Sequence, residues 1–150
     1  MSELVDTMCL EAAFRFLSGR DRFVAEIKQT LEQQGFGPED IEAVVRHLIR
    51  RKLVDDRRST QNLVAHRSGK RAAGVEKLRA ELERRGAPAE IIDECLAELS
   101  PADQREAMIA ALTGKFRTTD DRARAARFLL SRGFAEEDLE GALVEFFGSV

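Results

Sequence analysis

One phrase of this sequence is written three times, and each copy is centred on a glycine. Aligned without a gap, the copies bring Gly35, Gly86 and Gly133 into register. The three copies are the stretches 24–48, 75–99 and 122–146. A repeat of roughly 50 residues is typical of arrays in which each copy is one small unit packed against its neighbours. The repeat therefore predicts a series of similar units.

A helix is predicted after each of these glycines. Apolar residues recur there at i, i+3, i+4 and i+7, which is the spacing of one face of an α-helix. They are Ile41, Val44, Val45 and Leu48, then Ile92, Cys95, Leu96 and Leu99, then Leu139, Ala142, Leu143 and Phe146. In the first copy Pro38 suits the first helical position, and acidic residues follow it, as the positive end of a helix favours.

A second helix is predicted before each glycine. Its apolar residues are Val24, Ile27 and Leu31, then Val75, Leu78 and Leu82, then Ala126, Leu129 and Leu130. The glycine fits the position just past the helix end, where left-handed backbone closes the last turn without a Cβ penalty. The next residue, Phe36, Ala87 or Phe134, is expected to fold back on that turn.

A third helix precedes each of these helical hairpins. The first has Leu10, Ala13, Phe14 and Leu17 at helical spacing. The second follows Asp55 or Asp56 as its cap, and the third opens with Ser100 as N-cap, Pro101 and Asp103. With no strand pattern present, we predict an all-α fold, an elongated array of three tandem three-helix repeats. Its boundaries are expected at 1–51, 52–99 and 100–150.

Several classes of function find no support in the sequence. Cys9 and Cys95 lie on predicted apolar helix faces, where a free thiol behaves as a small hydrophobe, and His47 and His66 have no partner at ligand spacing. No nucleotide-binding motif occurs, so no cofactor, no metal and no catalysis are expected. No signal peptide and no membrane span is recognisable, which predicts a cytoplasmic protein.

Two ordered stretches carry a family resemblance. The first is "GRDRFVAEIKQTLEQQGFGPEDIEAVVRHL", and the second is "KLVDDRRSTQNLVAHRSGKRAAG", which contains Asp55, Asp56, Arg58, Arg67 and Gly74. Together with the three glycine-centred hairpins, they make residues 9–148 resemble the RecX family, regulators of the RecA recombinase.

The sequence departs from the family pattern at three positions. Ser59 stands where an aromatic residue is usual, Thr60 where alanine is usual, and Phe23 where a capping serine is frequent.

The resemblance implies a binding protein and not an enzyme. RecX-type proteins bind RecA and its nucleoprotein filament and suppress its ATPase, strand exchange and co-protease activities. An elongated array suits such a partner, because a rod can span several protomers of a helical polymer. We expect a monomer, with RecA as partner and weak contact with DNA phosphates in addition.

Positive charge is concentrated in the middle of the chain. Residues 52–85 hold 10 basic and 5 acidic side chains, although the whole chain has a net charge of −3. A patch of this kind fits phosphate or an acidic protein surface. The candidate partner-binding residues are Arg58, Arg67, Lys70, Arg71, Lys77, Arg79, Arg84 and Arg85. The alternative is a solvated helix face whose arginine stems cover apolar surface.

Two other functions stay open at this point. A DNA-binding protein of helix-turn-helix type should carry basic or amide side chains on the third helix of a unit, but 88–99 and 136–146 are acidic. A helical adaptor unrelated to recombination fits the repeat, but it does not account for the Asp-Asp-x-Arg stretch and the basic turn after it.

Overall fold

The computed structural model describes residues 4–148, which form nine α-helices and one short 3-10 helix, with no strand among them. The helices are α1 (Thr7–Leu17), α2 (Val24–Gln33), α3 (Pro38–Arg50), α4 (Asp56–His66), η1 (Gly69–Arg71), α5 (Val75–Arg85), α6 (Ala89–Ala97), α7 (Pro101–Thr113), α8 (Arg122–Ser131) and α9 (Glu136–Phe147). The predicted all-α class is confirmed. None of these helices has the length and apolar character needed to cross a membrane.

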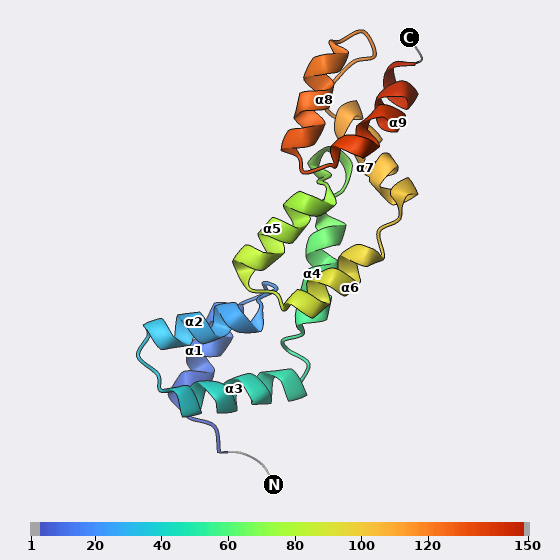
Figure 1. Cartoon of the computed structure of the whole chain (residues 1–150). Coiled ribbons are helices and arrows are strands. Elements are labelled where there is room, and N and C mark those ends of the chain that lie inside the picture. The colour runs from blue at the N-terminus through green and yellow to red at the C-terminus, as the bar shows by residue number, and fades with distance from the viewer. Residues whose placement is uncertain (1–3, 149–150) are drawn as a thin grey trace.

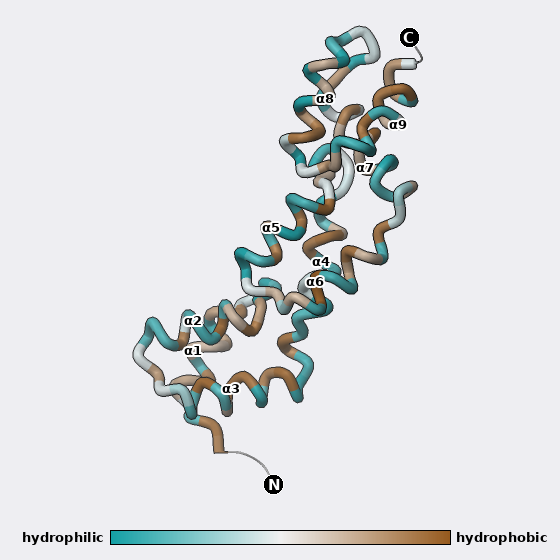
Figure 2. The backbone as a smooth tube through the Cα atoms, viewed as in Figure 1, coloured by the Kyte–Doolittle hydropathy of each residue, from teal (hydrophilic) through white to brown (hydrophobic). Residues whose placement is uncertain are grey.

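The helices form three successive groups along a rod (Figure 1). We call α1–α3, α4–α6 and α7–α9 the first, second and third units. Each unit surrounds its own cluster of buried apolar side chains. In Figure 2 hydrophobic residues recur on all three units, as an array with several small cores requires. The expected elongated array of three-helix repeats is confirmed.

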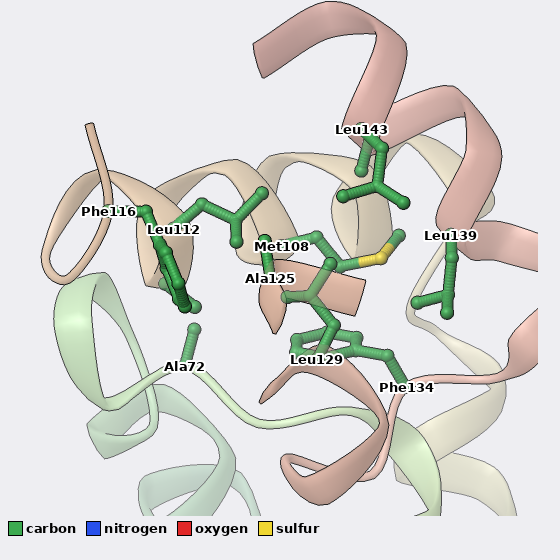
Figure 3. Close-up of a cluster of buried hydrophobic side chains, with 11 residues drawn as sticks. Ala72, Met108, Leu112, Phe116, Ala125, Leu129, Phe134, Leu139 and Leu143 are labelled. Carbon is green, nitrogen blue, oxygen red and sulfur yellow. The ribbon is translucent and has the colours of Figure 1, made fainter. Parts of the chain in front are cut away.

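Two of these clusters take a side chain from the preceding unit. Phe23, at the start of α2, is fully buried with the second cluster, beside residues such as Leu78 and Leu82. Ala72, just after η1, belongs to the third cluster, and Figure 3 shows it facing Phe116. Side chains therefore cross both junctions. We propose unit boundaries after residues 51 and 99, as the sequence predicts.

The three glycine turns have the same geometry. Gly35, Gly86 and Gly133 have φ angles of +90°, +89° and +86°, in the left-handed region. The closing hydrogen bonds run from Phe36 N to Leu31 O, Ala87 N to Leu82 O and Phe134 N to Leu129 O, at 3.2, 3.0 and 3.2 Å. The predicted helix ends, with a residue folded back after each glycine, are confirmed.

The predicted start of α7 is also confirmed. Ser100 Oγ accepts a hydrogen bond from Asp103 N at 3.0 Å, and Asp103 Oδ2 accepts one from Ser100 N at 2.8 Å. The hydrogen bond from the Ser100 backbone, and after it the interaction with the Ser100 side chain, hold the pKa of the Asp103 carboxyl below its ordinary value. Pro101 occupies the first turn, where its missing N–H has no helical partner to lose.

Two apolar residues were assigned to the wrong side of their helices. Phe14 is 43% exposed, because α1 buries the face of Cys9, Ala12 and Ala13. Apolar residues occur on both sides of α1, so spacing alone does not select the buried side. Leu130 is 45% exposed, since α8 turns the smaller Ala125, together with Leu129, into the core.

Both cysteines are free and buried, as the sequence predicts. Burial is the main cause that raises the pKa of the Cys9 and Cys95 thiols. A buried thiol with a raised pKa is a poor nucleophile, so these residues act as small apolar groups in the cores of the first and second units.

Candidate interaction surface at the unit junctions

The Asp-Asp-x-Arg stretch lies at the junction of the first and second units. Asp55 Oδ1 accepts a hydrogen bond from Arg58 N at 3.1 Å and so caps the start of α4. The guanidinium of Arg58 donates to the carbonyl of Lys52 at 3.2 Å, just past the end of α3. These contacts join the end of one unit to the start of the next.

Asp56 crosses the same junction. Its Oδ1 accepts a hydrogen bond from Val24 N at 2.9 Å, although the two residues are 32 positions apart. Asp56 therefore satisfies a backbone donor at the start of α2, where four N–H groups lack helical partners. Burial raises the pKa of Asp56, and the hydrogen bond from Val24 only partly opposes this. The hydrogen bond with Val24 thus holds the Asp56 side chain at the junction.

Phe23 and Ser59, the two positions that the family resemblance marks as departures, have complementary surroundings in the structure. Ser59 is buried on α4 and supplies no ring, but Phe23 enters the second cluster from the first unit and supplies one. A capping serine is absent at position 23, but Glu26 Oε1 accepts from Phe23 N at 2.8 Å and Asp56 serves the next amide. The aromatic group and the cap are both present, on different residues.

Arg85 fastens the second unit to the first. Its Nη2 donates to the carbonyl of Asp21 at 2.9 Å and to Glu26 Oε1 at 3.0 Å. Its guanidinium also lies 5.0 Å from the centre of the Phe23 ring. An arginine held by a carboxylate, a carbonyl and an aromatic face has little freedom left, so Arg85 acts as a clasp between the two units.

Arg132 makes the equivalent contact between the third unit and the second. Its Nη1 donates to the carbonyls of Lys70 and Ala72, each at 3.0 Å. The backbones meet as well, since Gly74 N donates to the carbonyl of Arg132 at 2.8 Å. A Cβ at Gly74 would overlap the backbone of Gly133, so this crossing requires glycine.

The eight candidate residues fall into two groups. Four have partners within the chain: Arg58 on backbone carbonyls, Arg67 with Glu81, Arg79 with Asp93 at 2.7 Å, and Arg85 with Glu26. The other four, Lys70, Arg71, Lys77 and Arg84, are exposed, and their side chains have no hydrogen bond or ion pair within residues 4–148. In the first group, Arg67, Arg79 and Arg85 are paired with carboxylates, whereas the carbonyl partners of Arg58 carry no net charge.

Three of the candidates come together at one place. Arg67, Arg71 and Lys77 line a hollow of about 280 Å³ between the second and third units, with Ala73 and Arg132. Arg132 was not among the residues selected from the sequence, because it lies in the third repeat, outside the basic stretch. A usable signal exists, since an arginine precedes the repeat glycine in both the second and the third copies.

In the part of the chain that the structure describes, no metal-binding group of side chains occurs. Within residues 4–148, no three His, Cys, Asp or Glu side chains are grouped so that they could hold a metal ion. The arrangement is suited to binding. Arg85 and Arg132 hold the two junctions between units, and cations without a carboxylate partner lie beside the second junction.

Comparison with known proteins identifies relatives over nearly the whole length. A family model described as the first three-helix domain of RecX matches residues 9–48. The Regulatory protein RecX of Chlorobaculum tepidum is 33% identical, over 93% of this chain and 88% of that protein. That of Trichlorobacter lovleyi is 40% identical, over 65% of this chain and 63% of that protein. The crystal structure of RecX from Lactobacillus salivarius superposes with a TM-score of 0.80, at 18% identity, covering 93% of this chain and 95% of that one.

Proposed function

Since the chain belongs to the RecX family of regulatory proteins, we propose that it binds the RecA recombinase and the filament that RecA forms on DNA. In this proposal it mostly inhibits the ATPase, strand exchange and co-protease activities of RecA, and so acts in DNA repair and the SOS response. It acts by binding, without catalysis, in the cytoplasm as a monomer. The relatives carry the name of a regulatory protein, which agrees with such a role.

The observation that supports this proposal most is the continuous rod of three units. A rod presents many small contacts to a long partner, and these contacts add up because they are held at a high effective concentration. Both junctions are fastened, by Arg85 and by Arg132, so contacts made by one unit hold the next unit in a defined position. A helical filament with repeating protomers is a partner of matching form.

The proposal is tested by titrating the protein into RecA that hydrolyses ATP on single-stranded DNA. We expect the hydrolysis rate to fall at protein concentrations below that of RecA, because one rod contacts several protomers. The same titration without DNA separates an effect on the filament from one on free RecA. An unchanged rate across the titration, with the protein shown to be folded by circular dichroism, would rule the proposal out.

A further inference from the structure

Exposed large apolar side chains are concentrated at the first unit. Among residues 4–148 six such side chains are exposed, and five of them lie in or beside the helices of this unit. They are Leu4, Met8, Phe14, Ile49 and Leu53, and the sixth is Leu130 on α8. A single exposed apolar residue is ordinary on a protein surface, but several on one unit indicate a surface that contacts another molecule.

Two of these side chains line one hollow. Phe14 and Leu53, each 43% exposed, border a hollow of about 440 Å³ together with Leu17. Its remaining lining residues are Ser18, Gly19, Arg20 and Asp21. The hollow therefore lies where the chain leaves α1 and where it leaves α3. Its volume falls within the range of about 300–1,000 Å³ that is usual for ligand pockets.

A strained turn at the end of α3 positions Leu53. Lys52 has a φ angle of +60°, in the left-handed region, and Leu53 N donates to the carbonyl of Leu48 at 3.0 Å. The three repeat turns close with the same hydrogen bond, but each has a glycine where this turn has Lys52. Left-handed backbone is unfavourable for a lysine, and strain of this kind is found most often where a function depends on the residue. Here it places a cation next to an apolar lining residue.

The two segments that form the hollow are strongly basic. Residues 14–21 and 49–53 include one acidic residue, Asp21, and five basic ones, Arg15, Arg20, Arg50, Arg51 and Lys52. Arg15 and Arg50 lie in the last turn of a helix, where the helix dipole favours a cation. Arg20 and Lys52 lie beyond the helix ends, so the dipole does not account for them.

The cations beside the hollow are not neutralised by the chain. Arg20 and Lys52 are exposed, and their side chains have no hydrogen bond or ion pair within residues 4–148. Arg58 donates to the carbonyl of Lys52 at 3.2 Å, and a carbonyl carries no net charge. Asp21 is already used within the chain, because its Oδ2 accepts a hydrogen bond from Asn62 Nδ2 at 2.8 Å. An apolar hollow with such neighbours favours a ligand that is both apolar and anionic.

We propose that this hollow binds a segment of a partner protein that carries a large apolar side chain between carboxylates. The apolar side chain is buried against Phe14, Leu17 and Leu53. The carboxylates of the segment face Arg20, Lys52 and Arg58.

Two other classes of ligand match the hollow less well. A hollow takes up one protruding side chain, whereas a lipid bilayer presents a broad surface. Two of the three apolar lining side chains are leucines, which offer a nucleic acid base no ring to stack on.

The test follows the methyl NMR signals of Leu17 and Leu53 in the full chain while a synthetic peptide is added. The peptide has glutamates on both sides of a central Leu-Phe pair. One control peptide has lysines in place of the glutamates, and another has Ala-Ala in place of Leu-Phe. We expect both signals to move with the first peptide and to stay in place with the two controls, because binding requires the apolar side chains and the negative charge together.

Variants of the chain locate the binding, with affinity measured by the fluorescence anisotropy of the labelled first peptide. Leu53→Gln removes an apolar wall and should weaken binding about tenfold. Phe14→Gln should do the same from α1, so the outcome does not depend on the folding of one variant. Arg20→Gln removes one exposed cation and should weaken binding about two- to fivefold. Leu130→Gln is the matched control, since Leu130 is 45% exposed on the third unit, and it should bind like the wild type.

Several results would overturn the site. They are an absence of signal movement with the first peptide, equal binding of the lysine peptide, and equal loss of affinity in Leu130→Gln. Displacement of the peptide by an oligonucleotide or by anionic lipid vesicles would assign the hollow to another class of ligand. Sedimentation of the chain as a dimer, abolished by Leu53→Gln, would assign the hollow to a second copy.

This inference adds to the proposed function and does not depend on it. A wild type that inhibits RecA, with no peptide binding at Leu53, refutes the hollow and keeps the regulator. A wild type without effect on RecA, with peptide binding that Leu53→Gln weakens and Leu130→Gln does not, does the reverse.

Discussion

The repeat glycines share one backbone conformation and have different surroundings. Gly35, in the first unit, has no other atoms within 4 Å of the place where a Cβ would stand. A Cβ at Gly86 would lie 2.5 Å from the Cβ of Ala25, and one at Gly133 would lie 2.5 Å from the amide nitrogen of Lys77. Glycine is therefore required once for its φ angle and, in two copies, a second time for close packing on the preceding unit.

Replacing these glycines with alanine should separate the two requirements. Gly35→Ala forces left-handed backbone on an L-residue and should lower the free energy of unfolding by about 1–2 kcal/mol. Gly86→Ala adds a steric conflict with Ala25 on a rigid helix, so its loss should be larger by about 1–3 kcal/mol. Urea denaturation followed by circular dichroism measures both.

Ala25→Gly is the control for that comparison, because it removes the atom that Gly86→Ala would strike. In the Ala25→Gly background, the cost of Gly86→Ala should fall toward that of Gly35→Ala. Equal costs in both backgrounds would show that the junction relaxes freely and that only the φ angle matters.

At the scale of the elements, the residue before each glycine determines whether the end of that helix contacts the preceding unit. The three copies have Gln34, Arg85 and Arg132 there. Arg85 donates to the carbonyl of Asp21, and Arg132 donates to the carbonyl of Ala72. Asp21 and Ala72 occupy the same register of their repeats, 14 positions before Gly35 and Gly86. The end of α5 and the end of α8 thus dock on the unit before them through one recurring contact, whereas the end of α2 carries Gln34 at this register.

Arg85→Gln, which introduces the residue that the first copy has at this register, should weaken the first junction. The change removes a partly buried ion pair and a charged hydrogen bond, and we expect a loss of about 1.5 kcal/mol in the free energy of unfolding. Arg79→Gln breaks an exposed ion pair within the second unit and should cost roughly 0.5 kcal/mol or less. Urea denaturation compares the two variants.

Hydrogen exchange shows which part of the chain each of these two variants destabilises. With Arg85→Gln, the amides at the start of α2 should exchange faster, whereas Arg79→Gln should leave them unchanged. Identical exchange at α2 in both variants would mean that Arg85 does not fasten the junction.

The elements were largely predictable, because their signals are local. The glycine turns, the Ser100 cap and the apolar face of α3 depend on residues within one or two turns of each other. Phe14 and Leu130 were misplaced because apolar residues lie on two sides of their helices. The contacts of Asp56 and Arg132 were not predictable in the same way, since they depend on the angle between units, which no local pattern encodes.

For the molecule as a whole, shape is the property that the repeat determines. A compact protein of this length would have a radius of gyration of about 15 Å. The rod in Figure 1 is extended, so small-angle X-ray scattering should give a clearly larger value, with the mass of a monomer. A radius near 15 Å would show that the units fold back on one another in solution.

Added salt at moderate concentration should leave the radius of gyration unchanged, because the buried clusters and backbone contacts hold the junctions.

The Gly74 and Gly133 crossing has a consequence for how such a molecule can grow. The second and third units each carry an Arg-Gly turn that docks on the unit before it. The residues that form a junction therefore lie within the repeated segments themselves. An extra copy of the second unit, inserted between the second and third, would bring an Arg-Gly turn for the unit before it and a Gly74 equivalent for the unit after it. A longer array could therefore arise by duplication of a gene segment, without new residues at the junctions.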